Sequence, residues 1–387
     1  MKMLISILGS TGSVGLNTLE IINKKKKYFK PYIFSGNKNY KLICKQIIKY
    51  KPKYYIINNQ VIFEKIVKKF KKSKIKILKS YDEINLISQK CVTVSAIPGI
   101  AGLEPLLKLI KYSSKVLVAN KEAVICGWDL IKKEAAKNKT KLIPIDSEHY
   151  SILKLLENQN LDQINKIYIT ASGGPFLNYK PSQMKNVTLK QALKHPKWKM
   201  GKKISIDSST LMNKIFEVVE AQKIFNIPYN KIDILIHPNS LVHAIIELKN
   251  GLKKFLYHDT SMKIPLANAI FDENIEIGQF IKKKRKVIIQ NLLFRDVNSK
   301  IFPSINLKKK MSQFPSTGII VNASNEVLVD HFLRKKINFL DIYKIIAMIL
   351  KDAKYRKYAI RKPKNIKQIY QIDLWARNQT LKKIHLR

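Results

Sequence analysis

One stretch of the chain, residues 195–220, gathers side chains that could bind an anion and a metal ion. It begins with HPKWKMGKK and continues with the hydroxyl-rich DSST, where a helix is predicted to start. Asn213, Glu217 and Glu220 have the i, i+4, i+7 spacing that places side chains on one helical face. An amide and two carboxylates on one face, after hydroxyls at a helix N-terminus, predict an anion site beside a cation site. The alternative is a solvated face of a surface helix.

A second pair of carboxylates follows an apolar, strand-like run that ends at residue 145. In an extended chain, Asp146 and Glu148 point to the same side. Together with Glu217 they offer three oxygen ligands, a set that suits Mg²⁺ or Mn²⁺. The alternative is that these acids cap the first turn of a helix.

The start of the chain predicts a dinucleotide site. An apolar strand at residues 4–8 leads into GSTGSVG at residues 9–15 and then into a helical run. Glycines at this spacing permit a tight turn and a close approach of the backbone to a pyrophosphate at the helix N-terminus. A second strand, at residues 32–34, is followed by no Asp or Glu that could hold the ribose 2′-hydroxyl of NAD. Lys38, between two asparagines, would tolerate a 2′-phosphate, so the sequence favours NADP(H).

The pattern of apolar runs predicts an α/β fold in three parts. Strands near residues 4, 33, 55, 75, 92, 116 and 142 alternate with helices such as 40–50 and 61–71, which indicates a doubly wound, Rossmann-like domain over 1–145. A central α+β catalytic domain for metal and substrate is expected over 146–272, with a flap near 195–203 and a type I′ hairpin at Asn250-Gly251. A connecting segment (273–301) and a C-terminal helical domain (302–387) complete the prediction.

Composition limits the classes of function. The formal net charge is +46, but only seven of the 73 basic residues are arginines and none precedes Arg285, so lysines spread along the chain account for the charge. That distribution argues against a nucleic-acid-binding protein, which remains the non-enzyme alternative. Three cysteines without a C-x-x-C pair favour a reducing, cytoplasmic setting. No apolar run approaches 18 residues, so no membrane span is expected, and because the first strand comes early we expect no leader segment either.

Taken together, these motifs resemble the 1-deoxy-D-xylulose 5-phosphate reductoisomerase family over nearly the whole chain. The resemblance rests on GSTGSVG at Gly9, GNKN at Gly36, ANKE at Ala119, PIDSEH at Pro144, SGGPF at Ser172, HPKWKMGKKISIDSSTLMNK at His195, LIHPNSLVH at Leu235 and NASNE at Asn322. Departures from the family pattern are small and lie at Pro98, Ala171 and Ser209. Another NADP-dependent oxidoreductase acting on a phosphorylated sugar or polyol remains the alternative enzyme.

The resemblance implies a reaction and a set of site residues. It implies rearrangement and NADPH-dependent reduction of 1-deoxy-D-xylulose 5-phosphate to 2-C-methyl-D-erythritol 4-phosphate, with Mg²⁺, Mn²⁺ or Co²⁺ and a homodimer. It assigns the metal to Asp146, Glu148 and Glu217, and catalysis to these three with Lys121 and His195. It assigns the substrate to Ser147, Glu148, Ser172, His195, Trp198, Ser208, Asn213, Lys214 and Glu217. It assigns the cofactor to Thr11, Gly12, Ser13, Val14, Gly36, Asn37, Lys38, Asn39, Asn120, Lys121, Glu122, Gly201 and Met262.

Overall fold

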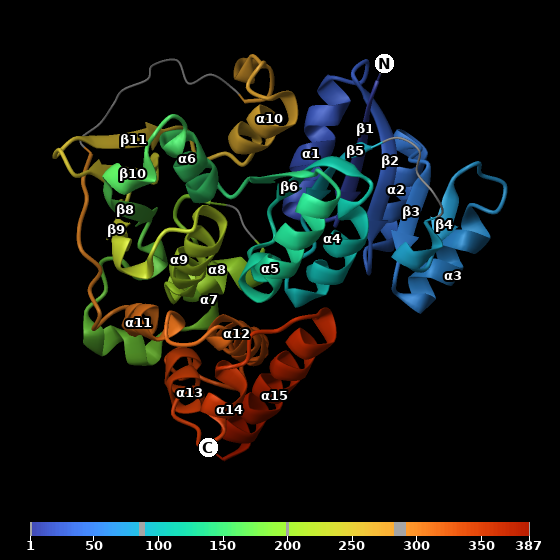
Figure 1. The fold of residues 1–387 in the computed structure, drawn as a ribbon. Coiled ribbons are helices and arrows are strands. Elements are labelled where there is room, and N and C mark those ends of the chain that lie inside the picture. The colour runs from blue at the N-terminus through green and yellow to red at the C-terminus, as the bar shows by residue number, and fades with distance from the viewer. Residues whose placement is uncertain (1, 85–89, 199–200, 282–291, 387) are drawn as a thin grey trace. The chain divides into compact units, whose positions relative to one another are not determined.

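The computed structural model describes residues 2–84, 90–198, 201–281 and 292–386 (Figure 1). The chain forms two compact units, each built from three separate stretches. The first unit contains Met1–Ala123, Asp129–Tyr150 and Ser261–Val287, and the second contains Val124–Trp128, Ser151–Thr260 and Ile288–Arg387. These units do not coincide with the predicted domain boundaries, because the helix after residue 262 packs onto elements of the N-terminal sheet. The functional roles given to the predicted segments stay predictions.

A parallel sheet of seven strands forms the first unit (Figure 1). The strands are β1 (Met3–Leu8), β2 (Phe29–Gly36), β3 (Tyr54–Ile57), β4 (Lys76–Leu78), β5 (Cys91–Ser95), β6 (Ser113–Val118) and β7 (Lys141–Pro144). Their order, β4-β3-β2-β1-β5-β6-β7, reverses direction at β1, which lies between β2 and β5. In open sheets of this kind, ligands bind beyond the carboxyl ends of the strands at the reversal point. The predicted Rossmann-like fold is therefore confirmed.

Helices connect the parallel strands, as right-handed crossovers require. They are α1 (Ser13–Lys24), α2 (Tyr40–Tyr50), α3 (Gln60–Lys69), α4 (Leu103–Ile110) and α5 (Lys121–Lys137). Helix α6 (Ser147–Leu156) follows the last strand, with residues 147–150 in this unit, and α10 (Lys263–Phe271) completes the unit. Helix α10 contacts α1 and β6, and Lys115 of β6 donates to the carbonyl oxygens of Ala269 and Ile270 at 2.9 Å. The buried lysine thus caps the C-terminal end of α10, where a cation is favoured.

The second unit combines a mixed four-stranded sheet with helices, in agreement with the predicted α+β and helical parts. Strands β8 (Ile164–Ala171), β9 (Ile232–Ile236), β10 (Val242–Leu248) and β11 (Lys253–Tyr257) take the order β11-β10-β8-β9. Its helices are α7 (Leu189–Ala192), α8 (Lys202–Ser209), α9 (Met212–Phe225), α11 (Leu307–Met311), α12 (Thr317–Leu333), α13 (Asp341–Ile349), α14 (Tyr355–Ala359) and α15 (Ile366–His385). Helices α12, α13 and α15 pack on one another. Within the described ranges, no helix has both the length and the apolarity that a membrane span needs.

The hairpin around Asn250-Gly251 is present, but its predicted type I′ turn is wrong. Strands β10 and β11 pair in antiparallel fashion, with Glu247 opposite Lys253. A type I′ turn needs a positive φ at both central residues, whereas here Gly251 has φ 87° and Asn250 does not have a positive φ. The Gly251 N–H donates to the carbonyl of Leu248 at 3.0 Å. The longer loop moves the left-handed position to the glycine alone, so asparagine is not forced into it.

Candidate functional site

The glycine loop after β1 is shaped by backbone contacts that exclude side chains. Gly9 has φ 83°, and a Cβ atom there would lie 2.7 Å from the carbonyl oxygen of Ala96. A Cβ atom on Gly15 would lie 2.5 Å from the carbonyl oxygen of Gly9. Gly12 precedes α1, and no side chain caps the N–H groups of its first turn. Free N–H groups at a helix N-terminus favour an anion such as a pyrophosphate.

A buried network of polar side chains holds this loop in place. It was not predicted from the sequence. The Gln46 amide donates to the Ser10 carbonyl at 2.9 Å, and the Tyr55 hydroxyl donates to Gln46 Oε1 at 2.7 Å. The Ser10 hydroxyl lies 2.9 Å from the Ser35 carbonyl of β2. Burial raises the pKa of Tyr55, so its proton stays available as a donor. Partners 36 residues apart carry no local sequence signal.

The predicted cofactor residues of the first unit lie mainly at the carboxyl ends of neighbouring strands. Gly36, the last residue of β2, lies beside Thr11, since an added Cβ would come within 3.2 Å of Thr11 Cγ2. Asn37, Lys38 and Asn39 follow it and are exposed. The Asn39 side chain accepts from the Leu42 N–H at 3.1 Å and therefore caps α2. Ser13 and Val14 form the first turn of α1.

Asn120 caps a helix, as Asn39 does. Its Oδ1 accepts from the Ala123 N–H at 2.8 Å, which caps α5, and its Nδ2 donates to the Gly99 carbonyl at 3.0 Å. Lys121 and Glu122 then open α5. Met262 also belongs to the first unit and directly precedes α10, whereas Gly201 belongs to the second unit and precedes α8.

The Asp146 segment is not extended, so the predicted strand geometry is wrong, although the carboxylates of Asp146 and Glu148 still come within 4.8 Å of each other. Helix α6 begins at Ser147, which places Glu148 in its first turn. The Ser147 N–H donates to Asp146 Oδ1 at 3.1 Å, and the Tyr150 N–H donates to the Asp146 carbonyl at 2.8 Å. An aspartate followed by serine satisfies free N–H groups at a helix start, which is why the helix begins here.

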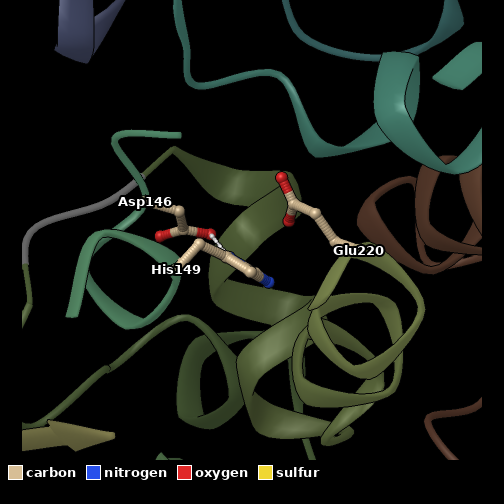
Figure 2. Close-up of side chains that lie close together, drawn as sticks. All are labelled: Asp146, His149 and Glu220. Atoms are coloured by element: carbon tan, nitrogen blue, oxygen red, sulfur yellow. Dashed lines mark ion pairs between the residues drawn. The ribbon is translucent and has the colours of Figure 1, made fainter. Parts of the chain in front are cut away.

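A lysine and a histidine of the same unit face the Asp146 carboxylate. Lys121 Nζ lies 2.8 Å from Asp146 Oδ2. His149 Nδ1 lies 4.0 Å from the same oxygen, as Figure 2 shows. Glu148 Oε2 accepts from the Ser147 hydroxyl at 2.7 Å. Lys121, Glu148 and His149 are buried. The first unit therefore brings two carboxylates, a cation and an imidazole together around the start of α6.

The predicted acidic face of α9 is confirmed in the second unit. Glu217 is buried, with its carboxylate 2.7 Å from Lys214 Nζ and accepting a hydrogen bond from Asn213. Glu220, one turn further along α9, is also buried (Figure 2). Because buried carboxylates require cationic or hydrogen-bonding partners, this face is not the solvated surface that was the alternative.

Ser208 does not stand at a helix start, contrary to the prediction. Helix α8 begins after Gly201 and ends at Ser209, so Ser208 belongs to its last turn. Leu211 then takes a left-handed conformation with φ 65°, and α9 begins at Met212. The DSST segment is thus the corner between two helices, because Gly201 starts the helix six residues earlier than expected.

His195 is held by three hydrogen bonds that define its tautomer. Its Nδ1 accepts from the backbone N–H groups of Lys197 and Trp198, at 3.2 and 2.9 Å. Its Nε2 lies 3.1 Å from the Ser172 hydroxyl and therefore carries the proton. Burial, and secondarily the positive charge of Lys214, lowers the pKa of His195 to about 4. Ser172, His195 and Lys214 are thus brought together in the second unit with a neutral imidazole among them.

Trp198 packs on a histidine pair that was not among the predicted site residues. Its ring lies edge-on to His243, with centroids 6.2 Å apart, and His243 stacks on His258 at 3.8 Å. His243 Nε2 donates to the His258 carbonyl at 3.2 Å. Of the predicted flap, Lys199 and Met200 lie outside the described residues, as do residues 282–291 of the predicted connecting segment. Closure of the flap stays a prediction.

Comparison with known proteins identifies the family. Three family models match the chain: "1-deoxy-D-xylulose 5-phosphate reductoisomerase" over residues 5–127, its "C-terminal domain" over 142–225, and "DXP reductoisomerase C-terminal domain" over 259–379. The reductoisomerase of Pelagibacter ubique is 42% identical over 376 residues, which cover 95% of this chain and 96% of that protein.

Solved structures agree with the sequence comparisons. A DOX-P reductoisomerase in complex with NADPH, fosmidomycin and magnesium has a TM-score of 0.91 and 29% identity, covering 99% of this chain and 98% of that one. The Zymomonas mobilis enzyme in complex with NADPH has a TM-score of 0.86 and 29% identity, covering 99% of each chain. The chain belongs to the 1-deoxy-D-xylulose 5-phosphate reductoisomerase family.

Proposed function

We infer that the chain converts 1-deoxy-D-xylulose 5-phosphate to 2-C-methyl-D-erythritol 4-phosphate, with NADPH and a divalent cation, as a step in isoprenoid precursor biosynthesis. The observation that carries this conclusion is 42% identity to a reductoisomerase along 95% of the chain. The site chemistry supports it, because each unit supplies a different part of what the reaction needs. The first unit supplies a glycine loop and the Asp146 group, and the second supplies a neutral histidine, hydroxyls and buried acids.

Asp146, Glu148 and Glu217 would hold the divalent cation. The donor set fits a hard ion, since all three are carboxylates, and the Glu217 side chain is only 1% exposed. Lys121 lies 2.8 Å from the Asp146 carboxylate and Lys214 lies 2.7 Å from that of Glu217, so each of these two acids has a cationic partner. A cation bound by these carboxylates would supply Lewis-acid chemistry at the substrate oxygens.

Ser172, His195, Ser208, Asn213 and Lys214 bind the phosphate group of the substrate. His195 donates through Nε2–H and stays neutral, so it adds a directed hydrogen bond without a titrating charge. A Cβ atom on Gly174 would lie 3.3 Å from the Ser208 carbonyl, so the loop carrying Ser172 abuts the end of α8. Lys214 supplies the positive charge that the phosphate dianion requires.

Lys121 donates toward a substrate oxygen near the metal, and its ammonium is oriented by Asp146 at 2.8 Å. Trp198 covers the substrate from the side of the His243–His258 pair, so water is kept from the reacting aldehyde. In the first unit, the glycine loop would hold the pyrophosphate of NADPH, Lys38 would accept its 2′-phosphate, and Met262 would pack on the nicotinamide. NADPH supplies the hydride that reduces the aldehyde.

The chain acts as a homodimer in the cytoplasm. Strand β11 is at the edge of the second sheet, as the described strands define it, and presents Phe255 (47% exposed), while Leu252 (60% exposed) directly precedes it. An open edge with apolar side chains favours pairing with another copy of the chain. Cys44, Cys91 and Cys126 are all buried free thiols, which fits a reducing compartment.

The test follows NADPH oxidation with 1-deoxy-D-xylulose 5-phosphate and Mg²⁺ or Mn²⁺, beside a chelator control. Metal-dependent oxidation with 2-C-methyl-D-erythritol 4-phosphate as product is expected. A folded protein that binds NADPH but oxidises none of it would contradict the proposal. Sedimentation of the wild type and of Phe255→Lys tests the dimer, which the lysine should weaken.

A further inference from the structure

A buried carboxylate, Asp207, lies in the last turn of α8 and is held from two sides. Its side chain is 2% exposed. Lys203, one turn earlier on the same helix, places Nζ 3.1 Å from Asp207 Oδ2. The other oxygen, Oδ1, accepts a hydrogen bond from Asn325 Nδ2 at 2.7 Å. A charge this deeply buried depends on both partners, because removal of either leaves part of it uncompensated.

Asn325 reaches Asp207 from α12, 118 residues further along the chain. It is fully buried, within a helix whose buried residues are mostly apolar. Its amide must direct nitrogen, not oxygen, to the carboxylate, since a carboxylate only accepts. The Asn325 Oδ1 atom has no hydrogen-bond partner among the described residues. Burying an amide whose oxygen has no hydrogen-bond partner destabilises the fold. The hydrogen bond from Asn325 to Asp207 is the interaction that offsets this cost.

The corner that Asp207 anchors carries three of the phosphate-binding residues proposed above. Ser208 follows Asp207 directly, and Asn213 and Lys214 lie in the first turn of α9. Between them, Leu211 has φ 65°, a conformation that a leucine holds only when its surroundings impose it. The Leu211 N–H donates to the Ser208 carbonyl at 3.1 Å, and the Lys214 N–H donates to the Leu211 carbonyl at 3.1 Å. A shift of the C-terminal end of α8 would therefore move Ser208 and, through Leu211, also Asn213 and Lys214 at the start of α9.

We propose that Asn325 is a positioning residue for the substrate phosphate: through Asp207 it fixes the α8–α9 corner that presents Ser208, Asn213 and Lys214. The inference rests on the proposed function. It gives the C-terminal helical segment a part in substrate binding, although Asn325 touches neither substrate nor metal ligand in this scheme. Phosphate affinity should then depend on Asn325, whereas NADPH affinity and the chemical step should not.

The test uses the full-length chain and three variants. Asn325→Leu removes the amide at similar size. The exchange Asp207→Asn with Asn325→Asp keeps one carboxylate and one amide across the same contact. Ser324→Ala is the matched control, because Ser324 is also fully buried on α12 and its hydroxyl has no hydrogen-bond partner among the described residues. For each protein we would measure kcat, KM for 1-deoxy-D-xylulose 5-phosphate, the inhibition constant of inorganic phosphate and the Kd of NADPH.

Asn325→Leu should raise KM and the phosphate inhibition constant together by about tenfold, the scale of one lost hydrogen bond to a charged group. Its kcat and NADPH affinity should stay within about twofold of wild type. The exchange should restore most of the phosphate affinity, and Ser324→Ala should leave it unchanged. If the leucine variant does not fold, Asn325→Ala, which also removes the donor and adds no charge, takes its place with the same expectation.

Two results would overturn the inference. A folded Asn325 variant with unchanged KM and phosphate inhibition, or one that loses kcat alone, would show that the bond to Asp207 is structural only. A wild-type chain that binds NADPH but does not turn over the substrate would instead remove the proposed function, and the inference with it.

Discussion

The neutral state of His195 leads to a quantitative prediction for the pH dependence of stability. The informative change is His195→Asn, because an asparagine side-chain oxygen occupies nearly the position of Nδ1. It can still accept from the N–H groups of Lys197 and Trp198. The variant keeps the local backbone contacts and removes the group that titrates, together with its pH-independent hydrogen bond to Ser172. Any difference in pH dependence between the two proteins then reports on the imidazole.

The sign and size follow from the pKa. In the unfolded chain His195 protonates near its ordinary pKa of 6.5, whereas burial and Lys214 lower the pKa to about 4 in the folded chain. Between these values the unfolded chain binds more protons, so stability falls as pH decreases from 6.5 toward 4. If the full pKa shift applied, lowering the pH from 7.5 to 5 would reduce the free energy of unfolding by about 2 kcal/mol. Because the ring is partly exposed, we expect about half of that, about 1 kcal/mol.

The assay is urea unfolding of wild type and His195→Asn at pH 7.5 and pH 5. Wild type should lose about 1 kcal/mol more than the variant between the two pH values. Histidine NMR of the folded proteins adds a direct readout, since the signal missing from the variant should titrate near pH 4. Equal pH dependence of the two proteins, or a titration midpoint near 6.5, would refute the argument that the imidazole is neutral and Nε2-protonated.

Three further predictions follow from the geometry. Glu217→Gln should abolish metal-dependent turnover while NADPH affinity, measured by fluorescence titration, stays nearly unchanged; near-normal turnover would remove Glu217 from the metal ligands. Lys38→Ala should weaken NADPH about tenfold and leave NADH unaffected, on the scale of one lost charge-assisted contact; an equal loss for both cofactors would show that Lys38 does not face the 2′-phosphate. Gly9→Ala should cost at least about 1 kcal/mol in urea unfolding, because φ is 83° and the Ala96 carbonyl is 2.7 Å from the new Cβ. Gly201→Ala, with nothing within 4 Å of the added Cβ, is the control and should be nearly neutral.

Local patterns were sufficient to predict much of the fold. The alternation of apolar runs gave the parallel sheet, and residues 40–50 form α2 as expected. The spacing of Glu217 and Glu220 correctly indicated one face of α9. These features depend on the periodicity of residues close in sequence, and that periodicity survives any tertiary arrangement.

The errors arose where two local structures compete for the same residues. The pair Asp146-Ser147 suits either the end of a strand or the start of a helix. It starts α6, because Asp146 accepts a hydrogen bond from a free N–H group of the first turn. Ser208 looked like a helix start because hydroxyls favour that position, but Gly201 begins α8 earlier. Asn325 lies in the NASNE motif but was given no role, because its partner lies 118 residues away and no spacing rule connects them.

The first unit is assembled from three separate segments of the chain, which affects how it folds during translation. Phe29 packs edge-on against Phe271 with ring centroids 5.6 Å apart, and Lys115 of the sheet caps α10 through Ala269 and Ile270. A nascent chain that has only reached residue 150 lacks α10, so these surfaces of the sheet layer stay uncovered on the ribosome. The nucleotide-binding unit therefore becomes complete only after more than a hundred residues of the other unit have been translated, and chaperones would meet it in an unfinished state.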